Sequence, residues 1–386
     1  MPRPHDSGCT PVSGAEDLGT HVRYAGQPII DRTGRVVATE LLFRWNARDG
    51  EVGPELGGYG TAAVLSNALI DAELLTRTPA AEHPLGDLLI NMDARTLMSP
   101  IAETVTPDIG VIEVLETVSV DEALTRRLRE LHGRGYRFAL DDVQRLDDPR
   151  WALAPWVQFA KVDVADLDGG RLSALIRQAH RLGLSVIAEK IEDEATLVRV
   201  RDAGADYFQG YAIARPTTTA VAALPGCDPR VIGQLMALAR AGVEASSLAM
   251  LAGRHPAVVV RLMRIQALHA PQTIVQAETM EEVLEALPRA LLMGWLTVLN
   301  LAATHGRDAD LASQLREELA TGRRRLREAA SGQSQRALDR ATFFLCQQLL
   351  RMRLKPPSMS PVPAAEVTRL PTPAATLADT QGLAAA

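Results

Sequence analysis

Residues 137–189 read RFALDDVQRLDDPRWALAPWVQFAKVDVADLDGGRLSALIRQAHRLGLSVIAE, and this stretch decides the fold. It holds three short apolar runs, at 137–141, 159–162 and 185–189, and an amphipathic segment at 170–182. Short apolar runs that alternate with longer amphipathic segments predict strands joined by helices, and therefore a largely parallel sheet. Each run also ends on an acidic residue or is followed directly by one.

The same alternation extends outward from this stretch, from about residue 23 to residue 216. It predicts further strands at 24–30, 35–43, 88–91, 111–115 and 205–210, and further helices at 62–75, 120–133 and 194–203. Eight strands with helices between most of them predict an α/β fold, a TIM-like (βα)8 barrel. The turn Asp-Arg-Thr-Gly at 31–34 predicts a hairpin between the first two strands, which would make the opening of the barrel irregular.

The remainder of the chain is expected to be helical. Residues 217–229, with a threonine run and a Pro-Gly pair, predict a linker. Helical apolar spacing then recurs at 232–241, 246–252, 256–268, 280–287, 290–303, 311–327 and 335–352. We therefore expect a disordered N-terminus (1–20), a barrel (21–220), a linker (221–229), a helical domain (230–355) and a disordered tail rich in Pro, Ala, Thr and Ser (356–386).

Composition excludes several classes of protein. The 386 residues are 47% hydrophobic and 23% charged, the balance of a soluble globular protein. A net charge of −6 argues against binding to a nucleic-acid polymer, which needs a basic face. The three cysteines are far apart and indicate neither a disulfide framework nor a thiolate metal site. The longest apolar run, 290–303, is too short for a membrane span, and the first twenty residues lack a signal peptide, so we expect a cytoplasmic protein.

Carboxylate and amide residues recur at the predicted strand ends. They are Glu40, Asn91, Glu113, Asp141, Asp142 and Glu189. A single acid at a strand end is usually a cap or turn residue, but so many in one lumen would be costly without cations. Oxygen ligands without Cys or convergent His favour Mg²⁺ or Mn²⁺, and two such ions would suit hydrolysis of a phosphodiester. Lys161 either positions the attacking water and stabilises charge or forms a salt bridge to Asp141 or Glu189.

A series of short motifs runs through the whole predicted barrel. They are Gln27-Pro28-Ile29, Glu40-Leu41-Leu42-Phe43-Arg44-Trp45, Ile90-Asn91, Ile112-Glu113, Asp141-Asp142, Lys161-Val162-Asp163, Ala188-Glu189, Phe208-Gln209-Gly210-Tyr211 and Arg215-Pro216. In type and order they resemble the EAL domains, which hydrolyse the bacterial messenger cyclic di-GMP to linear pGpG. Leu41 stands where the family name has alanine.

The resemblance implies a role for each matched residue. The metal ligands would be Glu40, Asn91, Glu113, Asp141 and Glu189, with Asp142 holding a second ion. Glu40, Lys161 and Glu189 would be catalytic, with Lys161 assisting the attacking water. Gln27, Arg44 and Gln209 would bind the dinucleotide, and a guanidinium suits phosphate because it forms paired hydrogen bonds with the phosphate oxygens.

One loop departs from the family pattern. Family members usually follow the paired aspartates with Phe-Gly and small residues, in a loop that helps to order the second metal and the dimer contact. This chain has Val143-Gln144-Arg145-Leu146-Asp147-Asp148 and loses conformations that only glycine adopts cheaply. A phosphodiesterase, with a possible homodimer, is therefore the leading hypothesis. A receptor or scaffold that binds cyclic di-GMP or partner proteins without turnover is the alternative.

The helical part has a looser resemblance. Residues 246–268, with Arg254-His255-Pro256, and residues 286–295 resemble parts of the HDOD domain, a helical signalling module, which implies a protein partner. HD-type hydrolases need an adjacent His-Asp pair. His255, His269 and His305 are followed by Pro, Ala and Gly, so we expect no second catalytic centre here.

Overall fold

Eight strands close into a barrel. The computed structural model describes residues 21–44, 57–72, 74, 88–222, 224, 226–270 and 277–303. The barrel strands are β1 (His21–Asp31), β2 (Val36–Phe43), β3 (Leu88–Met92), β4 (Gly110–Val114), β5 (Phe138–Val143), β6 (Phe159–Asp163), β7 (Ser185–Glu189) and β8 (Tyr207–Phe208). β2 to β8 are parallel and follow one another in chain order, and β1 closes the ring by pairing antiparallel with β2 and β8. The predicted TIM-like barrel is confirmed.

The opening hairpin is also confirmed, and its turn is fixed by the side chain of Asp31. Oδ1 of Asp31 accepts hydrogen bonds from the backbone N–H of Thr33 at 2.8 Å and of Arg35 at 3.0 Å. Gly34 has a φ of 83°, a backbone conformation that glycine adopts without a steric penalty. This turn makes β1 antiparallel to its neighbours, whereas the other barrel strands share one direction.

A ninth strand lies where the sequence indicated a linker. β9 (Thr217–Ala222) pairs antiparallel with the first half of β1, from Thr217 opposite Gly26 to Ala222 opposite His21. Threonine is β-branched and fits an extended, half-buried strand, so the threonine run forms a strand and not a connection. The linker expected at 217–229 is therefore wrong for residues 217–222.

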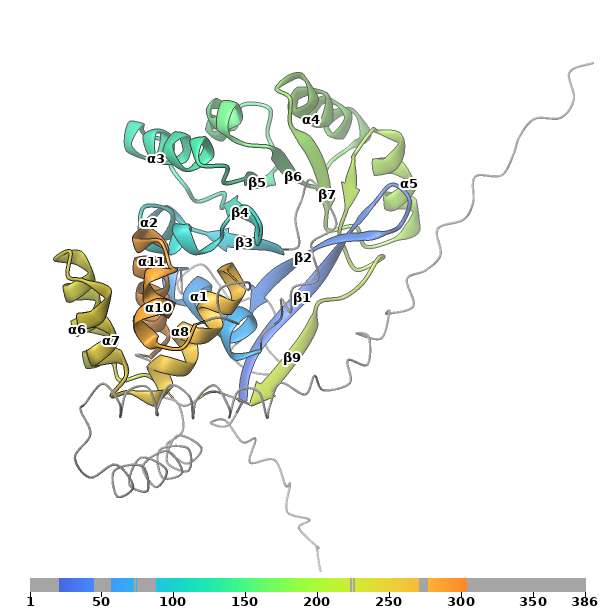
Figure 1. Cartoon of the computed structure of the whole chain (residues 1–386). Helices are drawn as coiled ribbons and strands as arrows, with labels where there is room; N and C mark the ends of the chain where they lie inside the picture. Colours follow the sequence, from blue (N-terminus) through green and yellow to red (C-terminus); the bar gives the residue numbers. More distant parts are fainter. Residues whose placement is uncertain are drawn as a thin grey trace, which may run out of the picture.

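Helices surround the barrel (Figure 1). They are α1 (Gly57–Val64), the π-helix η2 (Leu65–Asp71), α2 (Ala94–Leu97), the 3₁₀ helices η3 (Pro100–Thr104) and η4 (Pro149–Trp156), α3 (Glu122–Gly133), α4 (Gly169–Arg181) and α5 (Glu194–Asp202). An aspartate side chain caps the first turn of each of α3, α4 and α5, which fixes where these helices begin. The helix expected at 62–75 becomes α1 followed by η2.

The alternation of side chains along the strands builds the barrel interior in two layers. One layer is an apolar cluster, separate from the main core, of Ile29, Val37, Ala38, Leu89, Val111, Ala139, Phe159 and Ile187. On each of the strands β2 to β7, a polar residue lies two positions after a residue of this apolar cluster. On β1, which runs in the opposite direction, the polar residue lies two positions before the apolar one. The apolar layer therefore forms a floor beneath a polar layer at the carboxyl ends of the parallel strands.

Five described helices follow β9. They are α6 (Pro229–Arg240), α7 (Ala245–Ala252), α8 (Pro256–His269), α10 (Met280–Glu285) and α11 (Arg289–Ala303). They confirm the predicted helices between 232 and 303, and they gather beside α1 on one side of the barrel (Figure 1). None of the helices in the described ranges is long and apolar enough to cross a membrane. The helices expected at 311–327 and 335–352 and both expected disordered ends lie outside the described residues.

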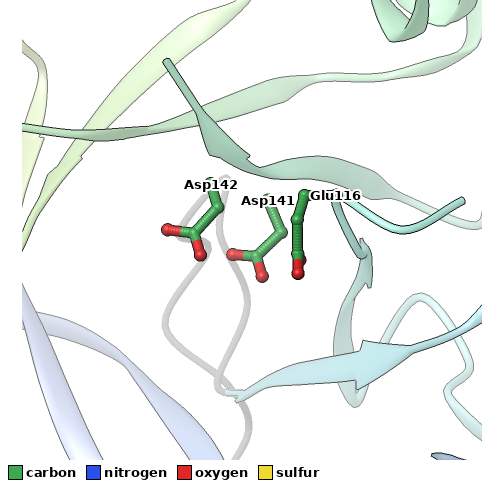
Figure 2. Close-up of side chains that lie close together, drawn as sticks. All are labelled: Glu116, Asp141 and Asp142. Carbon is green, nitrogen blue, oxygen red and sulfur yellow. The ribbon is translucent and has the colours of Figure 1, made fainter. Parts of the chain in front are cut away.

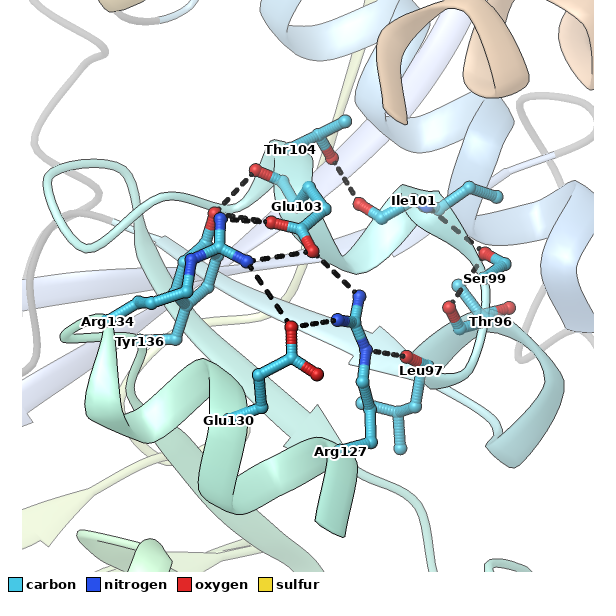
Figure 3. A network of polar contacts seen from close by, with 10 residues as sticks. All are labelled: Thr96, Leu97, Ser99, Ile101, Glu103, Thr104, Arg127, Glu130, Arg134 and Tyr136. Carbon is cyan, nitrogen blue, oxygen red and sulfur yellow. Dashed lines mark hydrogen bonds and ion pairs between the residues drawn. The ribbon is translucent and has the colours of Figure 1, made fainter. Parts of the chain in front are cut away.

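α11 packs directly on the barrel side through η3 and α1. At Gly294 the approach is so close that a Cβ would lie 2.5 Å from the carbonyl oxygen of Pro100 and 2.9 Å from Cγ2 of Thr104. η3 is in turn held by its buried Glu103, as Figure 3 shows. The Glu103 carboxylate lies 2.9 Å from Nη2 of Arg127 and 2.5 Å from Nη2 of Arg134.

α8 meets the barrel at the end of η2. Nη2 of Arg261 lies 3.3 Å from Oδ1 of Asp71, with both side chains at 2% exposure or less. Arg264 donates from Nη1 to the carbonyl oxygens of Ile70 at 2.7 Å and Asp71 at 3.1 Å. The Arg264 guanidinium satisfies carbonyl groups that a helix end leaves without an intrahelical partner. One buried arginine and one half-buried arginine of the helical part thus contact the side of the barrel.

Candidate active site

Lys161 on β6 stands at the centre of the polar layer. Its Nζ lies 2.6 Å from Oε1 of Glu113, 2.8 Å from Oδ1 of Asp141, 2.8 Å from Oε1 of Glu189 and 3.5 Å from Oε1 of Glu40. These carboxylates come from four different strands, and Lys161 itself is 1% exposed. The ion pairs of Lys161 with Asp141 and Glu189, one of the two roles weighed for it, are present, together with contacts to the other two carboxylates.

Amide side chains extend this group toward β1 and β3. Asn91 Nδ2 donates to Oε1 of Glu40 at 2.8 Å, and Gln209 Nε2 donates to Oε2 of Glu40 at 2.6 Å. Gln209 also lies 3.2 Å from Oε1 of Gln27, whose own Nε2 donates to the carbonyl of Ala214 at 3.1 Å. The chain therefore brings Gln27 and Gln209 together with Glu40 and Asn91, as expected for one common site.

Gly210 lets the backbone after β8 pack closely against Ile191. Its φ is 152°, and a Cβ there would lie 2.2 Å from the backbone of Ile191. Ile191 in turn donates from its backbone N–H to the carbonyl of Gln209 at 3.2 Å. Only a residue without a side chain permits this approach of the two loops.

One ammonium group does not neutralise four carboxylates. Burial raises the pKa of Glu113 well above its ordinary value of 4.5, and the charge of Glu40 raises it further. Burial also raises the pKa values of Glu189 and Asp141, against the lowering effect of Lys161. For Glu40 burial is opposed by Lys161 and by hydrogen bonds from Gln209 and Asn91, and the net pKa is lowered. The group thus carries an excess of acidic side chains.

The same residues fit a divalent cation. Among the described residues, the buried oxygens without a hydrogen-bond partner include Oε2 of Glu113, Oε2 of Glu189 and Oδ1 of Asn91. Buried polar atoms normally have a partner, and each unpaired one is costly. Carboxylate and amide oxygens are ligands that Mg²⁺, Mn²⁺ and Ca²⁺ accept. Glu40, Asn91, Glu113, Asp141 and Glu189 therefore form a donor set that suits a hard cation.

A second acidic group lies at the rim of the barrel (Figure 2). Glu116, Asp141 and Asp142 each offer an oxygen atom, and these atoms lie within 4.8 Å of one another. Asp141 belongs to both groups, whereas Asp142 is half-buried and Glu116 is exposed. Sequence reasoning missed Glu116 because it lies two residues beyond the end of β4, where the strand alternation no longer predicts the direction of a side chain.

Two predicted site residues lie apart from Lys161. Arg44, expected to bind phosphate, follows the end of β2, and its Nη1 donates to the carbonyl of Phe43 at 2.8 Å. Asp142, expected to hold a second metal ion, lies 3.2 Å from the ammonium of Lys190, a residue that sequence reasoning also missed. Lys190 directly follows the predicted metal ligand Glu189. A positive charge at this place in the sequence was the feature that could have identified it as a site residue.

The divergent loop after Asp142 is held by side-chain contacts. Gln144 Nε2 donates to Oδ2 of Asp163 at 2.8 Å. Trp151 Nε1 donates to the carbonyl of Arg145 at 3.1 Å, and Gln178 Nε2 donates to that of Leu146 at 2.9 Å. Side chains therefore supply contacts that fix the loop, in a segment where glycine would give only conformational freedom.

Known proteins resemble about half of the chain. The chain is 30% identical over 206 residues to the cyclic di-GMP phosphodiesterase CdgJ of Vibrio cholerae, covering 52% of the chain and 46% of CdgJ. It is 26% identical over 205 residues to the uncharacterized protein YuxH of Bacillus subtilis, covering 50% and 47%. The chain thus spans about half the length of these curated relatives.

Solved structures also match about half of the chain. Bacillus subtilis YkuI, a protein with an EAL domain in complex with cyclic di-GMP and calcium, has 21% identity, coverage of 52% of this chain and 55% of that chain, and a TM-score of 0.41. The EAL domain of Mycobacterium smegmatis DcpA has 24% identity, coverage of 50% and 91%, and a TM-score of 0.40. The model of the family described as EAL domain matches residues 18–216, which is more than half of the chain. The chain therefore belongs to the EAL domain family.

Proposed function

We propose that the chain is a metal-dependent phosphodiesterase that hydrolyses cyclic di-GMP to linear pGpG. The observation that carries the proposal is the convergence of four buried carboxylates on Lys161 at the carboxyl ends of the barrel strands, where barrels of this type assemble active sites. Membership of the EAL family and the similarity to CdgJ support the same reaction.

The cation is Mg²⁺ or Mn²⁺, held by Glu40, Asn91, Glu113, Asp141 and Glu189. A bound divalent ion would supply neutralisation of the phosphodiester and activation of a water molecule. The excess of acidic groups and the buried oxygens without hydrogen-bond partners support this assignment. The raised pKa values of Glu113 and Glu189 make cation binding depend on pH, because ligands must lose their protons to bind a metal.

The remaining residues of the polar layer bind and orient the nucleotide. Lys161 has its ammonium fixed by several carboxylates, so it is positioned to direct a water molecule or to stabilise negative charge on a phosphate. Gln27 and Gln209 present amide groups to the base or the sugar, and Gln209 also orients Glu40 through their 2.6 Å hydrogen bond. Arg44 reaches a phosphate by leaving its contact with the carbonyl of Phe43.

The helices after β9 have a separate role in this proposal. We assign them to an HDOD-like module that contacts a partner protein, on the motif resemblance at 246–268 and 286–295. Their buried contacts with η2 and η3 give such a partner a physical connection to the barrel. A homodimer would be compatible with the same arrangement.

A receptor without turnover is the second candidate, and the loop after Asp142 favours it. This loop has Gln144 and Arg145 where competent family members have small residues, and Gln144 is bonded to Asp163. Such a receptor would bind cyclic di-GMP through the same polar layer and would transmit the binding through the helices.

One experiment separates the two candidates. Purified chain is incubated with cyclic di-GMP in Mg²⁺ or Mn²⁺, and pGpG is measured by chromatography, with Glu40→Ala as the inactive control. Equilibrium binding of cyclic di-GMP is measured in parallel in Ca²⁺. Formation of pGpG by wild type alone supports the enzyme. Binding without pGpG identifies the receptor, and neither binding nor turnover overturns both candidates.

A further inference from the structure

At the rim of the barrel Lys190 lies against Asp142. Lys190 directly follows β7 and has a φ of 57°, and Asp142 on β5 has a φ of 47°. Within the described part of the chain these are the two non-glycine residues with positive φ. That backbone conformation is costly for a residue with a side chain, and such strain persists where the surroundings over-determine it, often at functional sites.

The Lys190 ammonium bridges two carboxylates. Its Nζ lies 2.7 Å from Oδ2 of Asp163 and 3.2 Å from Oδ1 of Asp142. Gln144 donates to the same Oδ2 of Asp163 at 2.8 Å, so the divergent loop takes part in this arrangement. The Asp163 side chain is 6% exposed. Burial raises the pKa of Asp163, but hydrogen bonds from Lys190 and from the N–H of Ala165 outweigh it, and the pKa is lowered.

Asp142 therefore already has an ammonium group as its partner. An ion held by Glu116, Asp141 and Asp142 (Figure 2) would share Asp142 with the Lys190 ammonium group, which would repel it. The polar layer around Lys161 differs, because several of its buried oxygens have no hydrogen-bond partner among the described residues. A metal ion is favoured at that layer and disfavoured at the rim.

We propose that Lys190 is a built-in cation that takes the place of a second metal ion at Asp142, so that the chain binds one divalent ion and not two. This inference rests on the proposed function of the polar layer. It changes the expected two-metal arrangement to one metal ion and one fixed ammonium group. The contacts of this ammonium with Asp142 and Asp163 are surroundings that hold Lys190 at its costly positive φ.

Metal stoichiometry tests this inference without any measurement of activity. The full chain is freed of metal with a chelator and titrated with Mn²⁺, and free Mn²⁺ is followed by electron paramagnetic resonance while heat is followed by calorimetry. Lys190→Gly removes the ammonium and suits the backbone, because glycine adopts positive φ readily. Lys190→Arg keeps the charge and is the matched control. Thermal unfolding confirms that each variant is folded.

The inference predicts one Mn²⁺ per chain for wild type and for Lys190→Arg, and two for Lys190→Gly. Adding Glu116→Gln to Lys190→Gly should return the value to one, because the second ion then loses a ligand. Two ions on wild type, or one ion on Lys190→Gly, would overturn the role of Lys190. No Mn²⁺ on wild type would overturn the metal site of the proposed function as well. One ion on wild type and on Lys190→Gly would overturn this inference alone.

Discussion

The Nζ atom of Lys161 lies 2.6 Å from Oε1 of Glu113, with the two side chains at 1% and 0% exposure inside the barrel. Barrels of this type normally fill the lumen with branched apolar side chains, and this one does so only at its floor. A buried ion pair is weak evidence for stability, because desolvation opposes the attraction between the charges. A polar layer in this position is better explained by function.

Metal binding should depend on pH and should change the stability of the chain. The raised pKa values of Glu113 and Glu189 mean that the folded state holds these protons more tightly than the unfolded state. Stability of the metal-free protein should therefore fall as the pH rises above the ordinary value of 4.5. Mn²⁺ replaces the protons, so it should stabilise the folded chain more at high pH than at low pH. Where the Mn²⁺ concentration is a hundred times Kd, the stabilisation should be about 2.7 kcal/mol. Thermal unfolding in chelator and in Mn²⁺ measures both effects.

Glu113→Gln is the control for this pH dependence. The amide has the same shape but does not titrate, so the metal-free variant should lose less stability with rising pH than wild type does. It should also gain less from Mn²⁺. An unchanged pH profile in Glu113→Gln would contradict the assignment of the titration to the polar layer.

Packing of α11 on the barrel should tolerate no side chain at Gly294. Gly294→Ala places a Cβ 2.5 Å from the carbonyl oxygen of Pro100 and should destabilise by about 1–3 kcal/mol, as overpacking does. Gly233→Ala in α6 is the matched control, because its Cβ would meet nothing within 4 Å. That change should be neutral or stabilising by about 0.5–1 kcal/mol. Urea unfolding measures both, and equal effects would argue against the close contact.

Removing one member of the buried Arg261–Asp71 pair should destabilise the chain more than removing both. Arg261→Met leaves the Asp71 carboxylate buried without its guanidinium, and loss of one partner of such a pair costs about 3–5 kcal/mol. The double variant Asp71→Asn, Arg261→Met should recover much of that loss. A double-mutant cycle by chemical unfolding gives the coupling energy. Simple additivity of the two changes would be inconsistent with a direct pair.

Glu103 should give the chain an acid-sensitive contribution to stability. Burial acts to raise the pKa of Glu103, but hydrogen bonds from Arg134 and Arg127 lower it below its ordinary value of 4.5 (Figure 3). The contribution is present above that value and is lost as the pH falls through the lowered pKa. Glu103→Gln should cost about 1.5–3 kcal/mol at neutral pH and less in acid. Urea unfolding at several pH values measures the difference in free energy of unfolding between wild type and Glu103→Gln. A difference that stays constant with pH would contradict the assigned role of Glu103.

The sequence predicted the barrel and most of the polar layer because both depend on alternation along strands. Once β4, β6 and β7 were placed, the shared inward face of Glu113, Lys161 and Glu189 followed from a period of two. Lys190 and Glu116 lie beyond strand ends, where loop conformation decides the direction of a side chain. The alternation along the strands therefore does not predict where these two side chains point. The strand β9 was missed because its pairing with β1 joins segments far apart in the chain.

The most direct test of the central claim is a single-turnover measurement with the full chain in excess over cyclic di-GMP in Mn²⁺. Excess protein makes even a slow reaction visible, and chromatography separates pGpG from cyclic di-GMP. The proposed function predicts conversion to pGpG by wild type, which stops on addition of chelator and is absent in Glu113→Gln. Cyclic di-GMP that is bound but recovered intact from wild type would contradict it.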